Sequence, residues 1–335
     1  MVRTGAYAYV KYGYETSTFG GSATIDKSFG LKSAVSGWTL TTNRIKMGKL
    51  GQVEPAQFAY GTQSGSLSIG FVLADKTSHE LFRAIYGAGT GSGTHASPIK
   101  YPATLAQGAA SKTFIGQSFS TEIGFTGETD TMVRTAKGCI LNSLNISATI
   151  GDVVNCSADI AYGKEAPLST TATTAASESS NAFTFAHGSL KLGGTTVAEV
   201  QEADITFAQN GDLLYQLGSQ QAVTGIKRTL DITGRFKASW KNDDLLANVI
   251  NQLKTNNTTS SVYKETYGDQ YTTSPEFELN FTNGVTGSGR RDIKITCSGL
   301  SIGDHTVSGL EPVEPVFEEI NWQVKTAQVE AVESN

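Results

Sequence analysis

The chain has 335 residues, a formal net charge of −5, only 17% charged residues and 36 glycines. A chain of this length can bury about three quarters of its unfolded surface and can form two domains. Low charge with abundant Gly, Ser and Thr indicates a turn-rich β protein, and it argues against a coiled coil, an acidic disordered chain or a tight nucleic-acid binder, which needs a concentrated basic face.

The first half predicts two strands, a short helix and further strands. Residues 38–43 and 65–71 alternate apolar and polar side chains, as half-buried strands do, with a Leu50-Gly51 corner between them. Three apolar residues then share one face of a short helix: Leu81, Phe82 and Ile85. A polar insertion at residues 87–118 separates this helix from the next strands.

The second half repeats this order at an offset of about 165 residues, which predicts a tandem duplication. Residues 203–207 and 229–240 are the predicted strands, and the corner is Leu217-Gly218. The predicted helix residues are Leu245, Leu246 and Val249, and the polar insertion is at residues 255–275. The alternative is two unrelated β segments that share a generic strand–helix order.

The predicted fold is all-β with two short helices, in two tandem β-sandwich or barrel domains. Residues 1–167 form the first predicted domain and residues 182–327 the second. Residues 168–181 contain almost no large apolar side chain, so they are the predicted linker. Residues 328–335 are predicted to be a frayed tail.

The clearest two-faced strand is predicted at residues 229–240. Leu230, Ile232 and Phe236 fall on one face, so we expect them to pack inside the domain. The other face carries the candidate water-facing residues, which are Thr229, Asp231, Thr233, Arg235 and Lys237.

The chain shows no sequence pattern of a catalytic, cofactor or metal site, and we predict none of the three. The Gly-rich run at residues 87–94 follows a helix, whereas a phosphate-binding loop precedes one. The four histidines are scattered and form no sequence cluster typical of a metal site. The cysteines lie far apart, so we expect buried free thiols at Cys139, Cys156 and Cys297.

Segments along nearly the whole chain carry a family resemblance. They are residues 12–19, 26–30, 38–45, 50–51, 58–61, 138–152, 217–219 and 225–234. At these segments the chain resembles the tail tube proteins of long-tailed bacteriophages and archaeal tailed viruses.

The resemblance implies a β-sandwich or barrel with a flanking helix, six of which form a ring. Their long strands then join into one β-barrel around a DNA channel, and the rings stack into a tube. Because the usual unit is about half this length, a duplicated chain predicts a trimeric, pseudo-sixfold ring. In such a ring the polar residues of strand 229–240 are the candidate lumen residues.

The same resemblance predicts the partners and location of the protein. The partners are further copies of the chain, other virion tail proteins and DNA that passes without specific binding. We expect the insertions 87–118 and 255–275, or the terminal arms, to join stacked rings. No membrane insertion is expected, because no apolar run near the N-terminus suits a signal or a span. The expected location is the virion tail after synthesis in the host cytoplasm.

Two other functions remain open at this point. A two-domain β-sandwich could bind carbohydrate or a host surface, with Tyr263, Tyr267 and Tyr271 as sugar platforms. Such a module would remain small and retain a glycan, whereas a tube protein assembles. A surface-layer or pilus subunit would also polymerise, but it would need an export signal.

Overall fold

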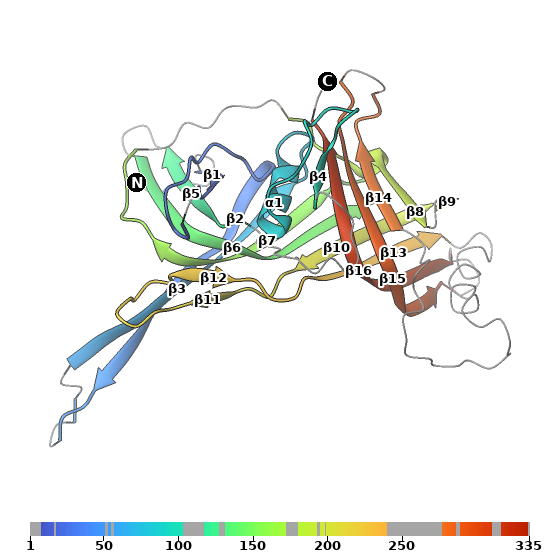
Figure 1. Ribbon diagram of the computed structural model, residues 1–335. Coiled ribbons are helices and arrows are strands. Elements are labelled where there is room, and N and C mark those ends of the chain that lie inside the picture. Colours follow the sequence, from blue (N-terminus) through green and yellow to red (C-terminus); the bar gives the residue numbers. More distant parts are fainter. Residues whose placement is uncertain are drawn as a thin grey trace.

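The computed structural model of the protein describes residues 8–16, 18–50, 53–54, 57–102, 117–126, 131–171, 180–192, 195–197, 199–239, 277–285, 289–309 and 316–333. Within these ranges the chain is dominated by antiparallel strands, with one short α-helix and two 3-10 turns (Figure 1). This confirms the all-β prediction.

The strand bounds are as follows. The strands up to residue 165 are β1 (Ala8–Tyr14), β2 (Leu31–Met47), β3 (Gln57–Val72), β4 (Ile99–Tyr101), β5 (Phe119–Thr126), β6 (Thr131–Thr149) and β7 (Asn155–Glu165). Those that follow are β8 (Gly188–Leu192), β9 (Thr195–Thr196), β10 (Val200–Ala208), β11 (Asp212–Leu214), β12 (Thr224–Ile226), β13 (Asp231–Ser239), β14 (Phe277–Thr282), β15 (Asp292–Ser308) and β16 (Phe317–Val332).

One 14-stranded sheet runs through both halves of the chain. Its path is β2-β3-β7-β6-β10-β13-β16-β15-β14-β8-β9, with β5 paired to β6 and β1 paired to β5 at the side. The halves meet where β6 pairs with β10, from Ser143 opposite Ala208 to Thr149 opposite Glu202. The sheet therefore passes from one half to the other through ordinary antiparallel pairing.

The strands on either side of this junction follow the same order. Residues 8–165 give β2-β3-β7-β6, and the side of β6 continues to β5 and β1. Residues 188–332 give β10-β13-β16-β15, and the side of β15 continues to β14 and β8. Six strands of each half therefore have a counterpart with the same neighbours, as a duplicated unit would.

One hydrophobic core extends under both halves. Ile146 on β6 and Ile205 on β10 are cross-strand partners across the junction, and both are fully buried. In β13, Ile232 and Phe236 are buried as the alternation predicts, while Leu230 is only partly buried. Burying one such large apolar side chain contributes roughly 1.5–3 kcal/mol, so the shared core holds the halves together.

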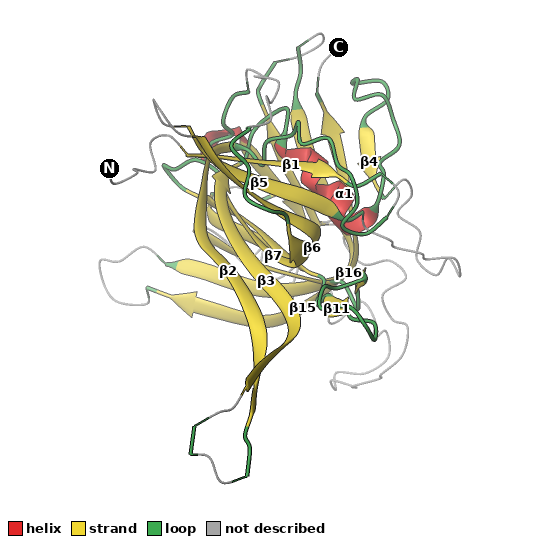
Figure 2. Ribbon diagram, turned by 90° about the vertical axis from the view of Figure 1, so that its left-hand side faces the viewer, coloured by secondary structure: helices red, strands yellow, loops and turns green. Residues whose placement is uncertain are grey.

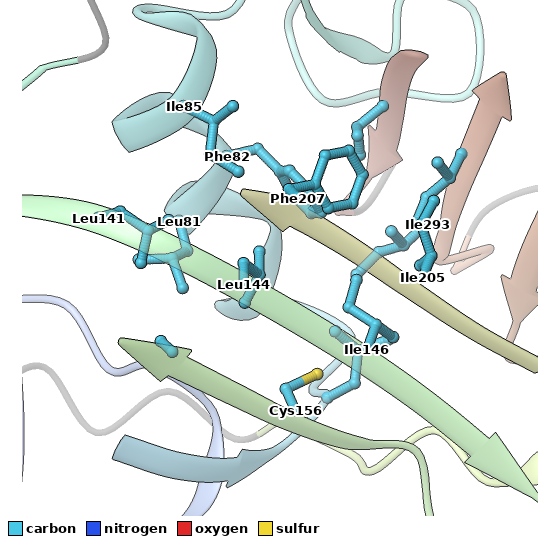
Figure 3. Close-up of a cluster of buried hydrophobic side chains, with 14 of the residues drawn as sticks. Leu81, Phe82, Ile85, Leu141, Leu144, Ile146, Cys156, Ile205, Phe207 and Ile293 are labelled. Carbon is cyan, nitrogen blue, oxygen red and sulfur yellow. The ribbon is translucent and has the colours of Figure 1, made fainter. Parts of the chain in front are cut away.

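The helix of the first half docks on this core. The 3-10 turn Ser78–Leu81 continues into α1 (Phe82–Tyr86), and Leu81, Phe82 and Ile85 are buried as predicted. The ring centroids of Phe82 and Phe207 are 5.4 Å apart in an edge-on arrangement, so the helix of the first half packs against β10 (Figure 3). The predicted helix around Leu245 lies outside the described residues.

The predicted frayed tail is wrong for most of its length. Residues 328–332 are the end of β16, which pairs with β15 on one side and with β4 on the other. Val329 and Ala331 are buried in the core. The alternation of Val329 and Ala331 is short and weakly apolar, and only the non-local partners of β16 reveal it as a strand.

The described ends of the predicted linker, residues 168–171 and 180–181, are tied to the first half. Ser169 pairs with Val133, and the backbone of Asn181 donates to Asp75. The three cysteines are buried free thiols, and burial raises the pKa of each well above its ordinary range. No helix in the described part of the chain has the length and hydropathy of a membrane span.

Candidate assembly surfaces

One face of the sheet is polar across seven strands, from β3 to β15. A single cross-strand row shows this, because each member is the register partner of the next. The row is Gly70, Ser157, Asn145, Thr206, Thr233, Gln323 and Ser301. A shallow depression of about 500 Å³ hollows this polar face over β6, β10, β13, β16 and β15. The alternate residues of these strands, such as Ile146 and Ile232, point to the other face and are buried in the core.

The charges of the polar face are more often negative than positive. Among the described residues its carboxylates are Asp159, Glu202, Asp204, Asp231 and Glu319. Its cations are Arg235, Lys237 and Lys325. Five acidic against three basic residues give this face a net charge of −2, which does not concentrate polyanions.

Arg235 lies among three of these carboxylates. Its Nη2 atom is 2.7 Å from Asp204 and 2.5 Å from Glu202, and its Nη1 atom is 3.6 Å from Glu319. The hydrogen bond to Asp204 is the main cause of the raised pKa of Arg235. The guanidinium is therefore already matched by acidic neighbours and offers little free positive charge at the surface.

The structure places only some of the candidate lumen residues of strand 229–240 on the polar face of the sheet. Thr233 and Arg235 line the depression, and Lys237 lies on the same face. Asp231 is the first residue of β13 and is partly buried, while Thr229 is exposed but precedes the strand. Matching polar rows lie on β6, β7, β10 and β16, which the prediction from strand 229–240 did not include although each has the same alternation.

The sheet has two long edges without a strand partner among the described residues. The first edge becomes clear from a comparison with β6. One side of β6 is paired near both of its ends, because residues 131–139 pair with β5 and residues 143–149 pair with β10. On β15, the counterpart of β6, residues 292–297 pair with β14, but residues 298–308 pair only with β16. The second edge is β2, the counterpart of β10, which pairs only with β3.

A two-stranded arm extends from the body beside the second of these edges. It is formed by the far ends of β2 and β3, from Arg44 opposite Tyr60 to Met47 opposite Gln57 (Figures 1 and 2). We call this segment, residues 44–60, the first arm. Its exposed apolar residues are Ile45, Met47, Leu50, Val53, Phe58 and Tyr60.

The counterpart in the second half is the β11–β12 hairpin with its flanks, residues 209–228, which we call the second arm. It folds back along the first half instead of projecting (Figure 1). The backbone N–H of Gln63 donates to the carbonyl of Gln220 at 2.7 Å, and the Tyr215 hydroxyl donates to the carbonyl of Gln63 at 2.7 Å. The tip residue of each arm is fully exposed: Leu50 in the first and Leu217 in the second.

A sheet with one polar and one apolar face, edges that are unpaired among the described residues and a projecting arm suits a subunit that assembles with copies of itself. A family model described as a phage tail tube protein matches residues 5–324. The chain belongs to this family. The match covers nearly the whole chain and confirms the resemblance carried by the sequence segments. A comparison with curated proteins gave no match. The molecule is therefore a structural β protein of a virion tail.

Polar contacts also tie the second arm and the residue before β15 of this tail tube protein to the first half. Arg291 Nη1 is 2.7 Å from the buried carboxylate of Asp75. Gln209 donates to the carbonyl of Ile85 at 2.9 Å, and Lys227 donates to the carbonyl of Ala84. Burial of Lys227 lowers its pKa to about 7. The contacts of Gln209 and Lys227 meet the end of α1, whose last carbonyls lack helical partners.

One cluster of possible metal ligands joins distant parts of the tail tube subunit. Ligand atoms of His79, Glu80 and Glu333 all lie within 4.8 Å of one another. Each carboxylate already has a nitrogen partner, since Glu333 is 2.8 Å from His79 Nε2 and Glu80 is 3.2 Å from Lys27 Nζ. The hydrogen bond from His79 lowers the pKa of Glu333. The arrangement is that of a link between the C-terminal strand and the first helix.

Proposed function

We propose that three copies of this chain close into a ring of six similar β domains, and that such rings stack into the tube of the virion tail. The observation that carries the proposal is the β6–β10 junction. Within one chain it already shows how one half joins the next by antiparallel pairing. The edge of β15 from Ser298 onward and the edge of β2 are the corresponding halves of a second junction.

Pairing of β15 in one copy with β2 of the next repeats the internal junction between subunits. Such a contact is head-to-tail, and a head-to-tail contact closes into a ring when the rotation per subunit fits. Three chains supply six domains and six junctions, of which three are internal and three lie between subunits. Closure pairs both sheet edges, which would otherwise be prone to aggregation.

The polar face is the proposed lumen wall. It continues without interruption through the internal junction, from Ser157 on β7 to Thr233 on β13. A water-filled channel needs such a face, while the opposite face packs on the core. Its net negative charge favours passage of DNA without retention, because phosphate binding needs a concentrated basic surface.

Partners and location follow from this role. The proposed partners are other copies of the chain, other tail proteins and DNA in transit, and the proposed place of synthesis is the host cytoplasm. The insertions 87–118 and 255–275, or the arms at the two termini, are the proposed stacking contacts between rings. In the first insertion residues 99–101 pair with β16, while residues 103–116 and the whole of 255–275 lie outside the described residues.

The experiment is a native mass measurement of the purified, assembled protein combined with negative-stain imaging. Rings or tubes whose unit contains three chains support the proposal. A stable monomer at high concentration, with no rings, would count against it and would favour a binding module. The tyrosines on which that alternative depends, Tyr263, Tyr267 and Tyr271, lie outside the described residues.

A further inference from the structure

The second arm shows how an arm of this fold contacts the neighbouring domain. Its tip region lies on the edge of β3 that β7 leaves free beyond Gly65. Three hydrogen bonds make this contact: Gln63 N–H to the Gln220 carbonyl, Tyr215 hydroxyl to the Gln63 carbonyl, and Gln220 Nε2 to the Tyr60 carbonyl at 3.2 Å. Further down, the N–H of Ala222 donates to Gly163 at 3.3 Å, and Ala222 is buried.

The first arm has the same place in its own half, but beyond the hydrogen bond from Gln220 to the Tyr60 carbonyl at its base its apolar side chains are largely exposed. Its residues Ile45, Met47, Phe58 and Tyr60 are each more than 40% exposed. A two-stranded hairpin with both faces in water is marginally stable at best. The second arm escapes this condition because the first half of the same chain lies under it.

We propose that the first arm of each subunit lies on the second half of its neighbour in the ring, against the segment that leads into β13. The proposal rests on the trimeric ring proposed above. In that ring β2 of one copy pairs with β15 of the next, just as β10 pairs with β6 inside the chain. The first arm then contacts the neighbour's second half in the same way as the second arm contacts the first half of its own chain.

The counterpart residues define the contact. Aligning the tips, Leu50 with Leu217, makes Val53 the counterpart of Gln220. Aligning the buried Phe71 of β3 with the buried Phe236 of β13 makes Arg228 the counterpart of Gln63. Val53 is fully exposed and the side chain of Arg228 is 65% exposed, so both are accessible in the single chain. The occupant of the Arg228 segment is therefore the first arm of a second copy.

The test is cysteine cross-linking of assembled rings in a chain that carries both Val53→Cys and Arg228→Cys. The native cysteines do not interfere, because Cys139, Cys156 and Cys297 are all buried. Oxidation, or a short bis-maleimide that tolerates a small register difference, is expected to join each subunit to the next. The covalent product then closes at three chains on a denaturing gel. Each single variant alone is expected to give no covalent trimer.

A matched positive control is the pair Gln63→Cys with Gln220→Cys, which is expected to cross-link within one chain without any increase in covalent mass. A covalent ladder that continues beyond three chains would show that the arm reaches another ring, and it would overturn the proposal. Val53→Cys is also combined with Ile226→Cys and with Leu230→Cys. If native mass shows trimeric rings but none of the three pairs gives a covalent product, the proposal is wrong while the proposed function stands. If the unmodified protein forms no rings, both the proposed arm contact and the proposed function are wrong.

Discussion

At the scale of single residues, the protonation of Lys227 on the second arm affects the stability of the fold. Burial lowers its pKa to about 7, whereas an unfolded lysine titrates near its ordinary value of 10.5. Between these values the unfolded chain binds one proton more than the folded chain, so the free energy of unfolding rises with pH. The gain in the free energy of unfolding is therefore complete only above the unfolded pKa of 10.5, and it is lost as the pH falls through about 7.

The corresponding prediction is that Lys227→Met flattens this dependence. In denaturant titrations from pH 7 to pH 9, the unmodified chain is expected to gain stability with rising pH and the variant to gain less. Lys164→Met serves as the control, because it removes a partly buried lysine from the first half instead of the second arm. Equal slopes for Lys227→Met and the unmodified chain would contradict a buried, neutral Lys227.

At the scale of elements, period-two alternation predicted the strands and the buried face of β13, because these depend on local pattern alone. The helix residues Leu81, Phe82 and Ile85 were also predicted, because a short amphipathic pattern needs no distant partner. The end of β16 was missed, since it is a strand only by virtue of β4 and β15. The arms were missed too: the sequence around Leu50 and Leu217 shows corners, but not how far the strands beside them project.

The packing of α1 gives the prediction for this scale. Phe82 is 1% exposed and meets Phe207 of the second half, so Phe82→Ala removes a contact between the halves as well as core volume. We expect a loss of about 3–5 kcal/mol in the free energy of unfolding. Leu50→Ala at the fully exposed arm tip is the control and should change stability by less than about 0.5 kcal/mol. Similar values for both variants in a denaturant titration would mean that the helix is peripheral.

At the scale of the whole molecule, the sheet order supports the proposal that one chain supplies two ring units. The repeated order was anticipated from the sequence, but the junction was not, because pairing of β6 with β10 depends on a contact between distant segments. The candidate lumen face was predicted only for one strand. Its full extent depends on the register of seven strands, which alternation within each strand does not determine.

The charge of the proposed lumen face can be tested with Thr233→Lys. Thr233 is exposed in the middle of the polar row, so the substitution adds a cation without disturbing the core. Assembled rings of this variant are expected to bind short duplex DNA more tightly than unmodified rings, with an affinity that falls as salt rises. Thr224→Lys on the second arm is the matched control and should leave binding nearly unchanged. An equal increase for both variants would place Thr233 outside the channel.

In the proposed assembly the internal β6–β10 junction is repeated between subunits, so that three chains close one ring. Electron cryomicroscopy of the assembled tube tests it most directly. We predict three chains per ring, with β15 from Ser298 onward paired antiparallel to β2 of the next subunit and with Thr233 facing the channel. Six chains per ring, with one half of each chain outside the barrel and β15 unpaired, would contradict the account.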